Sequence, residues 1–139
     1  MAIDRARLPA RHELKYYINP AELEALGRRL ARVMRLDSHC RGGRAYNVRS
    51  LYFDDAFDSA YYDKLDGVMT RDKYRLRIYN ASDAVIFLER KRKIGDLIQK
   101  SSVQITRRLC EQLMDGNPSG LQRAASRVLQ DMYIQMRTR

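Results

Sequence analysis

The sequence lacks the features that mark several common classes of protein. No apolar run approaches the roughly 20 residues that a membrane-spanning helix needs. The first 17 residues contain no apolar core of a secretory signal peptide. Only two cysteines occur, Cys40 and Cys110, without CxxC spacing, so neither a zinc site nor a disulfide framework is expected. These absences predict a cytoplasmic protein that works in a reducing environment.

Several catalytic and phosphate-binding motifs are missing as well. The sequence has no Walker A segment and no glycine-rich loop, so phosphate would have to be bound by side chains. No residues are arranged like a Ser-His-Asp triad. The two histidines, His12 and His39, have no partner at metal-ligand spacing, and we expect ordinary structural roles for them. Tryptophan is absent, which weakens the case for a module that stacks nucleic-acid bases.

What the sequence has in excess is positive charge. Of 139 residues, 27 are Lys or Arg and 17 are Asp or Glu, which gives a net charge of +10. Residues 70–100 hold nine basic and four acidic side chains, and therefore half of this net charge. Apolar residues make up 45%, enough for one globular domain with a modest core. A concentrated basic segment within a folded domain indicates a polyanionic partner.

Hydrophobic periodicity predicts an α+β fold with a mostly antiparallel β-sheet flanked by helices. Strands are predicted over residues 11–18, 47–54, 71–79, 84–93 and 97–106, the last two joined by a turn at residues 94–96. Helices are predicted from Asn19 to about Leu36, from Asp55 to Leu65, from Thr106 to Asp115, and from Leu121 onward. Asn19, Asp55 and Thr106 are the predicted N-caps.

The strand over residues 71–79 carries the strongest functional signal. Alternate side chains of a strand share a face and lie about 6.5–7 Å apart. One face of this strand is apolar and predicted to be core, with Tyr74, Leu76 and Ile78. The other face carries Arg71, Lys73, Arg75, Arg77 and Tyr79.

Lys91 and Lys93 extend this basic face if the next strand pairs alongside. Stacked cations repel one another unless anions lie between them, and a grid of guanidinium and ammonium groups suits a chain of phosphates. Glu13 and Glu89 interrupt the face, where they could orient arginines or bind a divalent metal. Two plainer interpretations stay open: a solvated outer face, and ordinary nucleic-acid binding.

Four motifs in order resemble the VTC domain, the catalytic domain of the vacuolar transporter chaperone polyphosphate polymerases and their bacterial relatives. They are RHELKYYI before an NP-capped helix, SLYFDD, RLRIYN, and FLERKRK with Lys100 downstream. This domain belongs to the triphosphate tunnel metalloenzyme (CYTH-like) superfamily. The resemblance implies an antiparallel tunnel whose basic residues hold a nucleoside triphosphate or a growing polyphosphate. It also implies that Mn²⁺ or Mg²⁺ assists transfer of the terminal phosphoryl group.

The residues matched to these motifs define the expected site. The first strand keeps Glu13 and Lys15 of the superfamily's E-x-E-x-K pattern, but Arg11 replaces the first glutamate, which resembles the polymerase branch. No catalytic residue is assigned. The expected metal ligands are Glu13 and Glu89. The expected phosphate-binding residues are Lys15, Tyr52, Arg75, Arg77, Lys91, Lys93 and Lys100.

The resemblance implies that residues 1–10 are an N-terminal extension and that residues 11–139 hold only the first half of a tunnel. We therefore expect weak phosphate binding and little polymerase turnover. We also expect either a homodimer or a C-terminal helix that covers the exposed basic face. Two other functions remain open: a non-catalytic module that binds polyphosphate or RNA, and a triphosphatase of the same superfamily. DNA is not an expected partner, and a membrane-protein partner is compatible with the family although nothing in the chain encodes an anchor.

Overall fold

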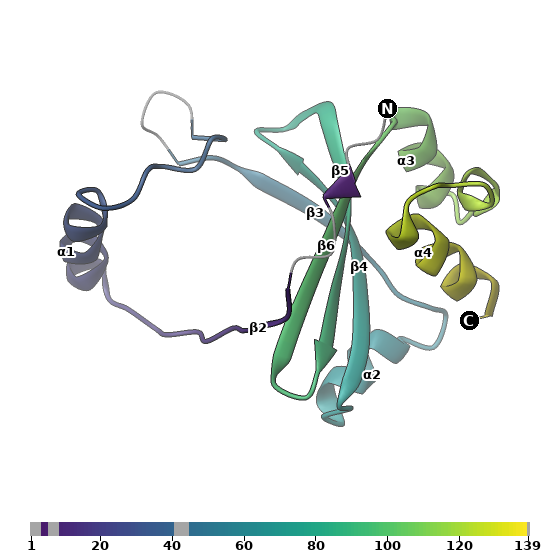
Figure 1. Ribbon diagram of the computed structural model, residues 1–139, viewed down its shortest axis with the longest axis horizontal. Coiled ribbons are helices and arrows are strands. Elements are labelled where there is room, and N and C mark those ends of the chain that lie inside the picture. The colour runs from purple at the N-terminus through teal and green to yellow at the C-terminus, as the bar shows by residue number, and fades with distance from the viewer. Residues whose placement is uncertain (1–3, 6–8, 41–44, 139) are drawn as a thin grey trace.

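The computed structural model describes residues 4–5, 9–40 and 45–138, and an antiparallel sheet with the strand order β1-β6-β5-β4-β3 is its centre (Figure 1). The strands are β1 (Asp4–Arg5), β2 (Arg11–His12), β3 (Val48–Phe53), β4 (Thr70–Tyr79), β5 (Ser82–Ile94) and β6 (Leu97–Ile105). The helices are α1 (Pro20–Leu30), α2 (Ser59–Leu65), α3 (Arg107–Met114) and α4 (Arg127–Thr138), with a 3₁₀ turn η1 (Ser119–Leu121). The predicted α+β class and the antiparallel sheet are confirmed.

The described strands form an open sheet. β3 lies at one edge and pairs with β4, whereas the two-residue strands β1 and β2 both pair with β6 at the other edge. No strand within the described residues joins these two edges, so the tunnel that the resemblance implies is not closed by them. β1 comes from the residues that we expected to be an N-terminal extension.

Tight turns connect the three long strands. Gly95 joins β5 to β6 with φ +56°, a left-handed conformation that glycine adopts without strain. Asn80 and Ala81 join β4 to β5, also with positive φ, as a two-residue type I′ hairpin turn requires. The register that results pairs Leu76 with Leu88 on adjacent strands, and Leu88 with Val103 on the next. Apolar residues of β4, β5 and β6 therefore share one face.

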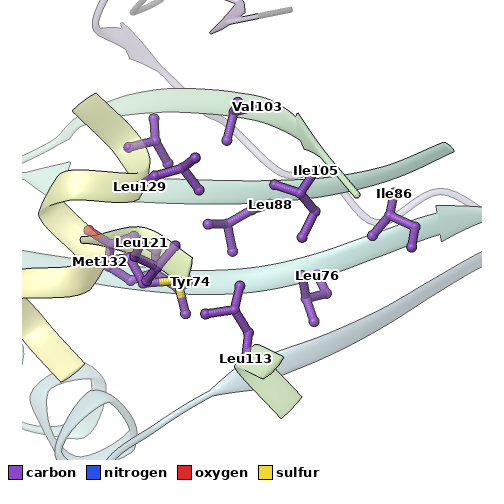
Figure 2. Close-up of a cluster of buried hydrophobic side chains, with 11 residues drawn as sticks. Tyr74, Leu76, Ile86, Leu88, Val103, Ile105, Leu113, Leu121, Leu129 and Met132 are labelled. Carbon is purple, nitrogen blue, oxygen red and sulfur yellow. The ribbon is translucent and has the colours of Figure 1, made fainter. Parts of the chain in front are cut away.

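That apolar face forms the core together with α3, η1 and α4 (Figure 2). Leu88 and Val103 are completely buried at its centre. The prediction that Tyr74 and Leu76 are core residues is confirmed, and Ile78 packs against them partly buried. The buried cluster consists of Tyr74, Leu76, Ile86, Leu88, Val103, Ile105, Leu113, Leu121, Val128, Leu129 and Met132.

The C-terminal helix lies on the apolar face, so the expectation that it might cover the basic face is wrong. Burying Val128, Leu129 and Met132 against the sheet removes apolar surface from water, which the charged face could not do. A partly buried ion pair also joins the two elements, because Arg90 of β5 donates a hydrogen bond from Nη1 to Oδ2 of Asp131 on α4. The basic face is thereby left uncovered by α4.

The first strand and the last helix are shorter than expected. β2 ends at His12, which pairs with Leu97. Because Leu97 is the first residue of β6, no further residue of β6 remains for the chain after His12 to pair with. Leu121 belongs to η1, and α4 begins only at Arg127, although Leu121 is buried as predicted. The predicted hairpin over residues 84–106 is confirmed and slightly longer on its first arm.

Helix α1 begins as predicted and ends early. Asn19 and Glu22 form a reciprocal capping box, in which each side chain accepts a hydrogen bond from the other residue's backbone N–H (2.9 and 2.8 Å). In the described part of the chain none of the residues of α1 is buried, and the helix stands apart from the sheet (Figure 1). An isolated helix of this length is marginal in water, and after Leu30 the chain continues in turns, in which the N–H of Met34 donates to the carbonyl of Leu30 at 2.8 Å.

Helix α2 shows that a neighbouring residue supplies the predicted cap. Asp54 accepts hydrogen bonds from the backbone N–H groups of Ala60 (2.8 Å) and Tyr61 (3.2 Å) in the first turn. Asp55, the predicted cap, instead accepts from Phe57 and Ser59, both at 3.0 Å. These bonds fix the turn that leads from β3 into α2.

None of the helices in the described ranges is both long and apolar enough to cross a bilayer.

Candidate functional site

The face of the sheet opposite to the core carries polar and charged side chains in rows. Residues paired across neighbouring strands share a face, so the register defines each row. One row consists of Lys73, Lys91 and Lys100 on β4, β5 and β6. The next consists of Tyr52, Arg75, Glu89 and Ser102 on β3 to β6. Arg71 beside Lys93 and Arg77 beside Phe87 flank these rows.

A cavity of about 900 Å³ lies over these rows. All seven residues that we expected to bind phosphate line it, including Lys15, which follows β2 rather than lying within a strand. The structure thus brings the predicted phosphate-binding residues together, and their role stays a prediction. Nine basic side chains of the charged face line the cavity: Lys15, Lys64, Arg71, Lys73, Arg75, Arg77, Lys91, Lys93 and Lys100.

Glu89 holds the two arginines at the centre of the cavity. Oε2 of Glu89 accepts hydrogen bonds from Nε (2.7 Å) and Nη2 (2.6 Å) of Arg75. Oε1 of Glu89 lies 3.6 Å from Nη1 of Arg77. Arg75 also donates from Nη1 to the hydroxyl of Tyr52 at 2.9 Å. Burial alone would lower the pKa of Arg75, but the bonds to Glu89 and Tyr52 outweigh it and raise that pKa, so Arg75 stays charged.

Arg77 has hydrogen-bonding capacity to spare. Its Nε is buried and has no acceptor among the described residues. Its Nη1 donates to the hydroxyl of Tyr79 at 3.3 Å. A buried donor without an acceptor costs free energy on the order of 1–3 kcal/mol. The side chain of Arg77 as a whole is 21% exposed and lines the cavity, so its terminal nitrogens can bind a phosphate oxygen.

Glu13 bridges two lysines at the β6 side of the cavity. Its Oε2 lies 2.7 Å from Nζ of Lys100, and its Oε1 accepts a hydrogen bond from Nζ of Lys91 at 2.6 Å. The bond from Lys100 and then that from Lys91 lower the pKa of Glu13 from 4.5 to about 2. Glu13 is consequently ionised at neutral pH and acts as a counter-ion for both lysines.

Four of the lining lysines have no such counter-ion. Among the described residues, no ion pair within 4 Å is formed by Lys15, Lys64, Lys73 or Lys93. Uncompensated cations that face one cavity raise the local concentration of anions. The cavity can therefore accept several negative charges from a ligand without first losing an internal bond.

The carboxylates do not by themselves form a ready metal site. Glu13 is bound by two lysines, and Glu89 lies between two arginines. Within the described ranges, no group of three His, Cys, Asp or Glu side chains is placed to hold a metal ion. Mg²⁺ commonly binds through one or two carboxylates together with substrate phosphates. The residues present do not fit a resident metal ion, and the metal role expected of Glu13 and Glu89 stays a prediction.

The sequence-based set of phosphate-binding residues omitted three cations of the cavity. Arg71 and Lys73 share the alternation that identified Arg75 and Arg77, so the signal for them was present in the sequence. Lys64 comes from α2, which contacts β4. No sequence pattern shows that contact, because it depends on the turn that Asp54 stabilises.

The sequence matches the family model described as VTC domain over residues 10–139. No curated protein matches the sequence.

Proposed function

Because the chain belongs to the VTC domain family, the family of the polyphosphate polymerases, we propose that its basic face binds the phosphate chain of a nucleoside triphosphate or of polyphosphate. The observation that carries this proposal is the cavity lined by nine basic side chains of the charged face, in which four lysines have no ion-pair partner within the described residues. This face would form one wall of the tunnel that the family resemblance implies.

The arginines and the lysines of the cavity would bind phosphate in different ways. A guanidinium group binds a phosphate through two parallel hydrogen bonds, whereas an ammonium group acts as a point charge. The side chains of Arg75 and Arg77 have defined positions, because Glu89 forms an ion pair with each of them. Lys73, Lys91 and Lys100 form a row across three strands that are each about 4.8 Å apart. The row therefore places further positive charge beside phosphates that lie on the two arginines.

Such a surface is chemically adequate for phosphoryl transfer. This reaction depends mainly on positioning and on neutralising charge, and needs no covalent nucleophile from the protein. Arg75 and Arg77 would orient the phosphates, and the lysines would neutralise the charge that spreads over the phosphate oxygens. A divalent Mn²⁺ or Mg²⁺ that arrives with the nucleotide would supply further charge neutralisation. We expect little polyphosphate synthesis from ATP by residues 1–139, since both carboxylates are engaged by cations; robust Mn²⁺-dependent synthesis would contradict that expectation.

The direct test removes the two arginines. We predict that Arg75→Ala combined with Arg77→Ala weakens binding of inorganic tripolyphosphate at least tenfold in calorimetry, because hydrogen bonds to charged groups contribute about 1.5–3 kcal/mol each. The matched control is Arg28→Ala combined with Arg29→Ala on α1, which removes the same charge from a helix that stands apart from the sheet (Figure 1).

The control separates a specific site from a general charge effect. We expect the α1 double variant to bind tripolyphosphate within about twofold of the unmodified protein, because exposed charges at such a distance are largely screened. Equal weakening by both double variants would mean that net charge alone attracts the ligand. An unchanged affinity of the Arg75/Arg77 variant would overturn the proposal.

A further inference from the structure

An aromatic cluster lies at the end of the basic face. Tyr79 is the last residue of β4 and follows Arg77 by two positions, while His39 and Tyr46 come from the segment between α1 and β3. The ring centroids of His39 and Tyr79 are 3.7 Å apart. Tyr46 lies 5.5 Å from Tyr79 and 5.7 Å from His39. All three residues are half-buried.

Hydrogen bonds from the ends of β3 and β4 hold this cluster in position. The side-chain amide of Asn80 donates to the carbonyl of His39 at 3.2 Å and accepts from the backbone N–H of Asn47 at 3.2 Å. Oδ1 of Asp37 is within hydrogen-bond distance of both the backbone N–H (2.8 Å) and the ring Nδ1 (2.9 Å) of His39. The segment that carries His39 is therefore tied to the strand ends.

The cluster continues directly from the phosphate-facing row. Nη1 of Arg77 donates to the hydroxyl of Tyr79, and the guanidinium carbon lies 5.8 Å from the centre of the Tyr79 ring. Phe87, which pairs with Arg77 across the strands, meets Tyr79 edge-on with centroids 6.4 Å apart. The rings thus lie on the charged face of the sheet, away from the apolar core.

We propose that His39, Tyr46 and Tyr79 bind the base of a nucleoside triphosphate whose phosphates lie on Arg75 and Arg77. The inference rests on the proposed function and names the end of the site at which the nucleoside sits. Arg75 precedes Tyr79 by four residues on β4, which corresponds to about 13 Å along a strand. A ribose triphosphate can span this distance. Aromatic rings stack on any base through its π-face. With the base bound at this cluster, the triphosphate would extend along β4 toward Lys73.

The cluster also sets the expected specificity. The three rings of the cluster offer stacking surface to any base, and the amide of Asn80 beside them already makes two hydrogen bonds within the chain. Purines have the larger π-face and stack more strongly. We therefore expect ATP and GTP to bind with similar affinity, and both to bind more tightly than CTP or UTP.

Two substitutions at one position test the proposal. Tyr79→Leu and Tyr79→Phe both remove the hydroxyl that contacts Arg77, but only Phe keeps the ring. Calorimetry with ATP and with inorganic tripolyphosphate gives, for each variant, the ratio of the two affinities, in which effects on phosphate binding alone cancel. We expect Tyr79→Leu to reduce the preference for ATP about tenfold, the scale of losing one base–aromatic stack, and Tyr79→Phe to retain it. Tyr17→Leu is the control, because the side chain of Tyr17 is fully exposed.

The outcomes separate this inference from the proposed function. If tripolyphosphate binds and Tyr79→Leu keeps the same preference for ATP as the unmodified protein, the base site is wrong while phosphate binding stands. The same conclusion follows if Tyr79→Phe loses the preference as fully as Tyr79→Leu, since the ring would then be irrelevant. If tripolyphosphate does not bind at all, the proposed function fails and the base site fails with it.

Discussion

At the scale of single residues, the carboxylates of the basic face act as counter-ions that hold cations in place. Glu89 fixes Arg75 and Arg77, and Glu13 fixes Lys91 and Lys100. Both acids were recognisable in the sequence as interruptions of a basic pattern. Their partners were not, because Glu13 meets lysines that lie more than 75 residues later in the chain, a contact that only the sheet creates.

The depressed pKa of Glu13 predicts a pH-dependent contribution to stability. A folded-state pKa of about 2, below the ordinary 4.5, means that the ionised form stabilises the fold above about pH 4.5. That stabilisation is lost as the pH falls toward 2. We expect Glu13→Gln to lower the free energy of unfolding at pH 7 by about 1 kcal/mol, the scale of a partly exposed ion pair. The difference from the unmodified protein should shrink as the pH falls toward 2.

Urea unfolding at a series of pH values measures this effect. Glu24→Gln is the control, because Glu24 forms an exposed pair with Arg28 one turn away on α1 and should contribute little at any pH. A Glu13→Gln difference that stays constant from pH 7 to pH 3 would show that the contribution is not electrostatic.

At the scale of elements, similar capping chemistry occurs in two very different surroundings. Asn19 caps α1, and Thr106 caps α3 by accepting a hydrogen bond from the N–H of Leu109 at 3.2 Å. Both caps were predicted and both are confirmed. The sequence could not show that α3 buries Leu113 whereas α1 lies exposed, because an apolar stripe shows which face would be buried and not what covers it.

This contrast predicts different consequences of losing each cap. Thr106→Ala should lower the global free energy of unfolding by about 1 kcal/mol, because α3 is part of the cooperative core. Asn19→Ala should leave the midpoint of thermal unfolding unchanged and instead accelerate hydrogen exchange at the α1 amides. Thermal unfolding and site-resolved hydrogen exchange distinguish the two effects. An equal loss of global stability in both variants would mean that α1 packs against the core in solution.

At the scale of the whole molecule, one face of the sheet is apolar and forms the core, and the other face is charged and forms the candidate phosphate-binding site. Alternation within β4 predicted both faces, because a strand necessarily sends successive side chains to opposite sides. The shape of the site was not predictable in the same way. Lys15 reaches the cavity from a loop, Lys64 from α2, and the described strands leave the sheet open where the resemblance implies a tunnel. The expected homodimer stays a prediction.

The measurement that tests the central claim most directly is the affinity of the unmodified protein for phosphate chains of increasing length. Orthophosphate, pyrophosphate, tripolyphosphate and a longer polyphosphate are titrated by calorimetry at one fixed ionic strength. Because the cations lie in successive rows, we predict that affinity rises with each added phosphate until the rows from Lys73 to Arg77 are filled, and then levels off. Equal affinity for orthophosphate and tripolyphosphate would contradict a site built for a chain of phosphates.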